Sequence, residues 1–80
     1  MERELEILTS AIVDTLNVYP GEITEETTFL GDLGADSLDV YQIVMAVEEE
    51  LGITLDNEAI KEVKNVKEAV ELIKKAEADQ

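Results

Sequence analysis

Ser37 is the residue of this chain with the clearest capacity for chemistry, because a serine hydroxyl can form an ester. It follows the segment GDLGAD and stands between two acids, Asp36 and Asp39. The sequence contains no His and no Cys, so a Ser-His-Asp or Cys-His catalytic centre lacks its general base. The commonest zinc and iron ligand sets are missing for the same reason, and no metal site is expected. If Ser37 reacts, another protein must activate it.

The element that positions Ser37 is expected to be a helix running to about Leu51. Asp36 is a suitable N-cap, Asp39 places a negative charge in the first turn, and Gly52 suits the position just past the end. Serine is common at helix starts, so its position alone requires no function. The free N–H groups of a first turn also suit a phosphate. The flanking acids would repel a diffusible anion, whereas a covalently attached phosphodiester would tolerate them.

Apolar residues of this helix fall on two faces of a helical wheel. The face assigned to the core carries Val40, Ile43, Val44, Val47 and Leu51. Leu38, Tyr41 and Met45 lie on roughly the opposite side, bordered by Gln42, Glu48 and Glu49. An apolar patch with an acidic border is typical of a protein interaction site. The alternative is that the last helix or a loop buries this second stripe, with Leu38 expected to be partly buried beside the loop.

Three further helices are predicted around this one. The first is expected over Arg3–Leu16, and a short one over Asn57–Glu62 with Asp56 as its N-cap. The last begins after Asn65, where Glu68 completes a capping-box-like start. Its core face carries Val66, Ala69, Val70 and Ile73. No stretch shows the alternation of apolar and polar residues, with a period of two, that is typical of a β-strand. We therefore expect an all-α fold, a small four-helix bundle of three main helices and one short helix, in a single domain over residues 1–80.

A long loop is expected between the first two helices, because Pro20 and Gly21 end helical structure. Within it, Thr24 is expected to cap a brief helical turn. Four irregularly spaced apolar residues are expected to hold the loop against the helices: Ile23, Phe29, Leu30 and Leu33. A loop of this length in so small a domain indicates a function or a packed Ω-like segment.

The charge of the chain restricts its partners. The net charge is -14, and no Lys or Arg occurs between Arg3 and Lys61. Such a surface repels nucleic acid and anionic membranes and attracts basic partners, although it could also serve only as a solvated surface. No apolar run approaches the length of a membrane span, and the segment MERELEIL is too acidic for a signal peptide. A soluble, cytoplasmic monomer without membrane insertion is expected.

The segment Asp32–Ile53, DLGADSLDVYQIVMAVEEELGI, closely resembles the prosthetic-group helix of acyl carrier proteins of the fatty-acid synthase type. The match centres on GADSLD, residues 34–39, and is supported by MAVEEE, residues 45–50. The length, the acidity, the four-helix pattern and the long first loop also fit. The resemblance therefore covers nearly the whole chain.

The resemblance implies a carrier and not an enzyme. It implies that a phosphopantetheinyl transferase (holo-ACP synthase) attaches 4'-phosphopantetheine from coenzyme A to Ser37 with the help of a magnesium ion. Acyl groups would then travel as thioesters on the thiol of this arm, which explains how a chain without Cys takes part in thiol chemistry. The implied partners are an acyl-ACP synthetase or malonyl transferase, ketoacyl synthases and other synthase enzymes with basic docking patches.

The family's docking contacts correspond to eight positions around this helix. These are Asp36, Leu38, Asp39, Tyr41, Gln42, Met45, Glu48 and Glu49. Acids that meet Lys and Arg patches give fast, salt-sensitive and weak contacts, which suit a carrier that leaves each enzyme after each step. The resemblance also implies that the acyl chain lies between the helices, among residues such as Val44, Val47, Ile60 and Val66.

Three residues depart from the family pattern. Gln42 stands where a glutamate is usual, Tyr41 where a small β-branched residue is common, and Asp56 where a proline often precedes the third helix. The resemblance still implies delivery of acyl thioesters to fatty-acid (or related) biosynthetic enzymes, and a specialised carrier for polyketide, peptide-type or D-alanine transfer is the alternative within the family. An unmodified acidic interaction module is an alternative from a different class. A divalent-cation-binding protein is the least supported alternative, since no spacing matches an EF-hand loop, although Glu48–Glu50 could collect cations diffusely.

Overall fold

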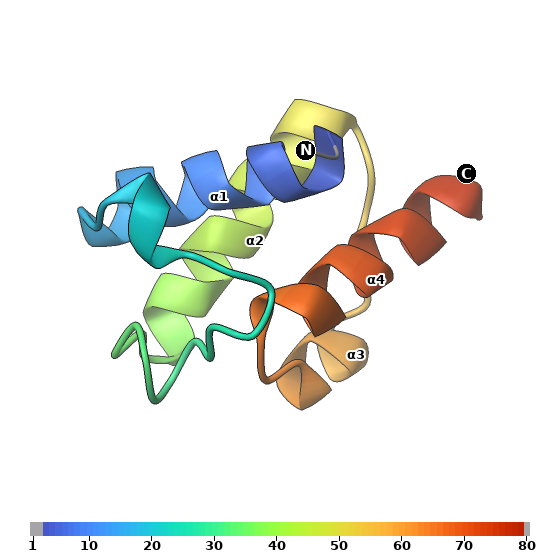
Figure 1. Ribbon diagram of the computed structural model, residues 1–80. Helices are drawn as coiled ribbons and strands as arrows, with labels where there is room; N and C mark the ends of the chain where they lie inside the picture. The colour runs from blue at the N-terminus through green and yellow to red at the C-terminus, as the bar shows by residue number, and fades with distance from the viewer. Residues whose placement is uncertain (1–2, 80) are drawn as a thin grey trace.

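The computed structural model describes residues 3–79, which form four α-helices and one short 3-10 helix (Figure 1). The elements are α1 (Arg3–Leu16), η1 (Pro20–Glu22), α2 (Ser37–Leu51), α3 (Asn57–Glu62) and α4 (Val66–Ala78). Within residues 3–79 the only β-type pairing is an isolated bridge between Thr28 and Asn65. The predicted all-α fold with three main helices and one short helix is confirmed. No helix of this part of the chain is both long and apolar enough to cross a bilayer.

The helix boundaries follow from capping residues that the sequence already indicates. Asp56 caps α3 by accepting a hydrogen bond from the N–H of Glu58, and Asn65 caps α4 by accepting one from the N–H of Glu68. The carboxylate of Glu68 accepts from the N–H of Lys64 at 2.8 Å, so the reciprocal bond is formed one residue earlier than in a standard capping box. Asp56 thus provides a side-chain cap at the start of α3.

Gly52 ends α2 in the left-handed conformation, with φ 66°, which a side chain at this position would strain. Its N–H donates to the carbonyl oxygen of Glu48 at 2.8 Å. The predicted end of this helix is therefore confirmed. The chain then crosses to α3 through Ile53 and Leu55, whose side chains are both buried.

The long loop between α1 and α2 is tied to the start of α4 by backbone hydrogen bonds. Phe29 donates to Lys64 at 3.2 Å, and Thr27 and Glu25 accept from Val66 and Lys67, both at 2.9 Å. Because these bonds satisfy backbone groups that no helix pairs, the loop packs as an ordered layer over the bundle. The prediction of a packed loop is confirmed in outline.

Two local predictions for this loop were wrong. The helical turn lies at η1, where Pro20 supplies a φ suited to a first helical position. Thr24 instead begins a simple hydrogen-bonded turn, closed by the bond from the N–H of Thr27 to its carbonyl oxygen. Phe29 is buried, and Ile23 and Leu33 pack against the core, but Leu30 is 78% exposed. Phe29 takes the inward direction at this turn, and its neighbour Leu30 projects outward.

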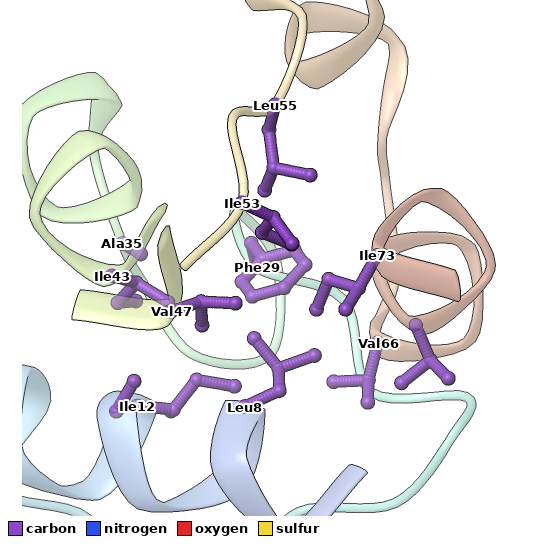
Figure 2. Packing of buried hydrophobic residues seen from close by; sticks show 12 residues of the cluster. Leu8, Ile12, Phe29, Ala35, Ile43, Val47, Ile53, Leu55, Val66 and Ile73 are labelled. Atoms are coloured by element: carbon purple, nitrogen blue, oxygen red, sulfur yellow. The ribbon is translucent and has the colours of Figure 1, made fainter. Parts of the chain in front are cut away.

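The core lies between α1, α2 and α4, as Figure 2 shows. Leu8 of α1 points into the space between Val47 of α2 and Ile73 of α4, with Phe29 and Ile53 beside it. α1 contacts both α2 and α4, whereas no Cα atoms of α2 and α4 lie within 8 Å of each other. Phe29 of the loop and Ile53 and Leu55 of the α2–α3 connection lie in the space between α2 and α4, beside which the cavity described below is found.

Candidate functional site at the start of α2

Ser37 is the first residue of α2, but it is not the residue that caps the helix. Asp36 is the N-cap: its Oδ1 accepts from the N–H of Asp39 at 2.9 Å, and Oδ2 of Asp39 accepts from the N–H of Asp36 at 3.3 Å. Ser37 is exposed, and its hydroxyl forms no hydrogen bond with any residue from 3 to 79. The structural role of a capping serine is therefore filled by Asp36, and the Ser37 hydroxyl remains available to an external group.

The segment that leads into Ser37 is fixed by a buried anchor. Ala35 is 2% exposed, and its N–H donates to the carbonyl oxygen of Phe29 at 2.9 Å. Gly34 adopts the left-handed conformation with φ 63°, which turns the chain toward the helix. The serine is thus presented from a defined backbone position.

The second apolar stripe of α2 is exposed, as the helical wheel predicted. Leu38, Tyr41 and Met45 are 65%, 53% and 47% exposed, whereas Ile43 and Val47 on the core face are 2% and 1% exposed. The expectation that Leu38 would be partly buried was wrong, since Leu38 is the most exposed of the three. The loop is anchored by Ala35 and not by a contact with Leu38, which explains the difference.

The polar residues around this stripe do not share one environment. Gln42 and Glu49 are exposed. Glu48 is half-buried, and its Oε2 accepts from the N–H of Leu55 at 2.8 Å. Asp36 and Asp39 are bound to the helix start, as described above. Glu48 therefore fixes the α2–α3 connection, a role that the sequence did not indicate because its partner lies seven residues away in a non-helical segment.

A small apolar cavity of about 30 Å³ lies between α2, α3 and α4. It is lined by Leu8, Phe29, Val40, Ile43, Val44, Val47, Leu55, Ile60, Val63, Ala69, Leu72 and Ile73. Val44, Val47 and Ile60 were predicted here and do line it. Val66 does not line the cavity. Its side chain is fully buried at the first turn of α4, where the Val66 N–H donates to the carbonyl oxygen of Thr27.

Comparison with known proteins decides the family. The family described as "Phosphopantetheine attachment site" matches residues 6–73. An acyl carrier protein of Treponema pallidum (strain Nichols) is 48% identical over 63 residues, which cover 79% of this chain and 81% of the relative. The chain belongs to the acyl carrier protein family. The resemblance found in the sequence is thereby confirmed.

Other relatives agree with this assignment. An acyl carrier protein of Zymomonas mobilis is 40% identical over 73 residues, covering 91% of this chain and 94% of the relative. A solved structure of the acyl carrier protein from Enterococcus faecalis superposes with a TM-score of 0.75 at 25% identity, covering 91% of this chain and 92% of that chain. Since the family is defined by its attachment site, phosphopantetheine is the cofactor of this chain.

The start of α2 fits such a group. The hydroxyl of Ser37 is exposed and unbonded, and no residue from 3 to 79 accepts a hydrogen bond from the N–H groups of Ser37 and Leu38. These two N–H groups lie at the positive end of the helix dipole, where a phosphodiester is stabilised. The exposed site also leaves room for a long flexible arm.

Proposed function

We propose that Ser37 carries the phosphopantetheine arm and that the protein delivers acyl groups on this arm to enzymes of fatty-acid synthesis. The observation that supports this most directly is the free hydroxyl of Ser37 at the first residue of α2, next to an exposed apolar stripe. Ser10, the other serine of the chain, lies within α1 and has no helix start beside it. Of these two serines, only Ser37 stands at a helix start with unpaired backbone N–H groups.

The attachment reaction is a transfer of a phosphoryl-linked group from coenzyme A. The Ser37 Oγ forms a bond to the phosphorus next to the pantetheine portion, and the bond from that phosphorus to the bridging oxygen breaks. 3',5'-ADP leaves, and the serine proton passes to a general base in the transferase active site. A magnesium ion on the transferase neutralises the phosphate oxygens during the step.

Partner enzymes are proposed to dock on the face that carries Leu38, Tyr41 and Met45. These side chains supply an apolar centre, and the surrounding acids attract basic residues and speed the encounter. Met adapts to differently shaped partners, while Tyr offers a rigid apolar surface with a polar tip. Once docked, a tethered thioester acts at high effective concentration without tight binding.

The acyl chain is proposed to shelter in the cavity between α2, α3 and α4. At about 30 Å³ the cavity has room for roughly one water-sized group, so a chain of several methylene groups requires these helices to separate further. The absence of close backbone contact between α2 and α4 favours such a movement, because it breaks no backbone packing. Val44 of α2 and Ile60 of α3, which both line the cavity, would contact the bound chain.

The test is intact mass spectrometry of the purified apo protein after incubation with coenzyme A, magnesium and a broad-range phosphopantetheinyl transferase. A mass gain of one phosphopantetheinyl group is expected for the wild type and for Ser10→Ala, and none for Ser37→Ala. An unchanged wild-type mass would support the unmodified interaction module instead. A gain that persists in Ser37→Ala would place the arm elsewhere.

The cargo is tested on the modified protein. Fatty-acid, D-alanine and amino-acid ligases are supplied in turn with their substrates and ATP, and thioester formation is followed by mass. The proposal expects loading by the fatty-acid ligase. Loading only by the D-alanine or the amino-acid ligase would identify a specialised carrier and contradict the fatty-acid pathway.

A further inference from the structure

Leu30 is the most exposed large hydrophobic residue within residues 3–79, at 78%. It lies in the loop before α2, directly after the buried Phe29. A single exposed leucine needs no explanation when its backbone is free to move. Leu30 differs because its turn is fixed on both sides.

The turn that carries Leu30 is held by a set of short hydrogen bonds. The N–H of Thr28 donates to Oδ2 of Asp32, and the N–H of Asp32 donates to Oγ1 of Thr28, both at 2.9 Å. Leu33 donates to the carbonyl oxygen of Thr28 at 3.1 Å. Gly31 completes the turn, since a Cβ there would lie 3.0 Å from Thr28 Oγ1. A side chain presented on such a fixed turn loses little conformational entropy when a partner covers it.

The same turn is hydrogen-bonded to the segment that leads into Ser37. The bond from the N–H of Ala35 to the carbonyl oxygen of Phe29, at 2.9 Å, joins the turn to a residue only two positions before the serine. Leu38, one position after the serine, is 65% exposed. One exposed leucine is therefore carried on the turn tied to the segment before Ser37, and another follows Ser37 in α2.

We propose that Leu30 is a docking contact for the transferase that modifies Ser37, and that it matters less for enzymes that act later on the arm. This inference rests on the proposed function of Ser37. The transferase must bring its active site to the Ser37 Oγ itself, so its surface reaches the loop that precedes the serine as well as α2. An enzyme that receives a thioester works at the far end of a flexible arm and can dock on α2 alone.

Steady-state kinetics of arm attachment test this inference, with apo protein as the varied substrate and coenzyme A saturating. Leu30→Ala is expected to raise the KM for apo protein about tenfold with little change in kcat, because an apolar contact is lost. Tyr19→Ala is the matched control, since Tyr19 is 77% exposed in the same loop but lies next to η1. This control is expected to keep the wild-type KM. Leu30→Met, which retains a large apolar side chain, is expected to have a KM close to that of the wild type.

Two further measurements separate a docking role from a general effect. The thermal unfolding midpoint of Leu30→Ala should equal that of the wild type, because the side chain is exposed. The KM ratio of Leu30→Ala to wild type should also persist at high salt, since an apolar contact is not screened. A ratio that disappears at high salt would contradict an apolar contact.

The later step gives the discriminating outcome. Modified Leu30→Ala, prepared at high protein concentration, is expected to be loaded by an acyl-ACP synthetase with the wild-type kcat/KM. An equal loss at this step would contradict the selective role. An unchanged KM for arm attachment would overturn the inference alone, whereas a wild type that gains no arm would overturn the proposed function and this inference with it.

Discussion

Asp36 and Asp39 each accept a hydrogen bond from the other's backbone N–H, at 2.9 and 3.3 Å, and so close the first turn of α2 around Ser37. This reciprocal pair completes the cap without the serine hydroxyl. The two acids therefore have a structural role at the helix start, besides the docking role proposed for this face of α2.

The first prediction concerns this cap. Asp36→Ala should lower the free energy of unfolding by about 1 kcal/mol, because the N–H of Asp39 loses its acceptor. The thermal midpoint should fall by about 4–8 °C in a domain of this size. Asp36→Asn is the matched control, since its amide oxygen still accepts the bond and stability should be retained. Equal loss in both variants would show that charge, and not capping, stabilises this turn.

The second prediction concerns Glu48, whose carboxylate binds the N–H of Leu55 at 2.8 Å. Glu48→Ala should cost about 1–2 kcal/mol, because the N–H of a buried residue is left without its partner. Glu48→Gln should restore most of this loss, and Glu49→Ala on the exposed side should have little effect on stability. Chemical denaturation measures all three. Hydrogen exchange should also be faster at Leu55 in Glu48→Ala, and unchanged exchange there would contradict the assigned contact.

The two faces of α2 give the third prediction. Val47→Ala should lower the free energy of unfolding by about 2 kcal/mol, because it opens a cavity at a residue that is 1% exposed. Met45→Ala, two positions away, should leave stability nearly unchanged and should instead weaken binding to a ketoacyl synthase. Denaturation and surface plasmon resonance on the same pair of variants separate these effects. A destabilised Met45→Ala would mean that the stripe is buried in solution.

The fourth prediction concerns the contact between the ends of α1 and α4. A hydrogen bond with Glu4, together with desolvation, raises the pKa of Glu77 above its ordinary value, although Arg3 lies 3.0 Å from its carboxylate. A backbone hydrogen bond and the same bond with Glu77 lower the pKa of Glu4, so the proton of this pair resides on Glu77. The folded protein thus binds this proton more tightly than the unfolded chain does. The resulting stabilisation is present at low pH and is lost as the pH rises through the folded pKa of Glu77.

Glu77→Gln should therefore change the pH profile of stability. The variant is neutral at every pH, so its thermal midpoint relative to the wild type should be higher at pH 7 than at about pH 4. A constant difference for Glu77→Gln across this range would contradict the raised pKa of Glu77.

The fifth prediction follows from the net charge of -14. Raising sodium chloride from about 0.02 M to about 0.2 M should increase the thermal midpoint by several degrees, because the shorter Debye length screens the repulsion between the surface acids. Magnesium chloride at equal ionic strength should stabilise at least as much. Coincident melting curves at low and moderate salt would rule out self-repulsion as a destabilising force in this protein.

Local signals in the sequence determined the helices and the two faces of α2. The capping residues of the helices bind or shape backbone groups only a few positions away, so their effect can be predicted without the fold. These residues are Asp36, Gly52, Asp56 and Asn65. Helical periodicity likewise places Met45 and Val47 on different faces of α2, because the directions of both side chains are set by the geometry of one helix. The GADSLD segment likewise indicates Ser37 as the attachment residue from the sequence alone, since its residues are consecutive in the chain.

Only the tertiary structure decided which side chains of irregular segments turn inward. Phe29 and Leu30 are adjacent and both apolar, and their opposite exposure follows from hydrogen bonds between the loop and the start of α4, which are distant in the sequence. The partner of Glu48 and the exclusion of Val66 from the cavity have the same origin. Such contacts join segments whose relative position no local pattern specifies. The sequence alone thus determined where α2 begins and which residue it presents, and the packing of the loop decided what stands beside that residue.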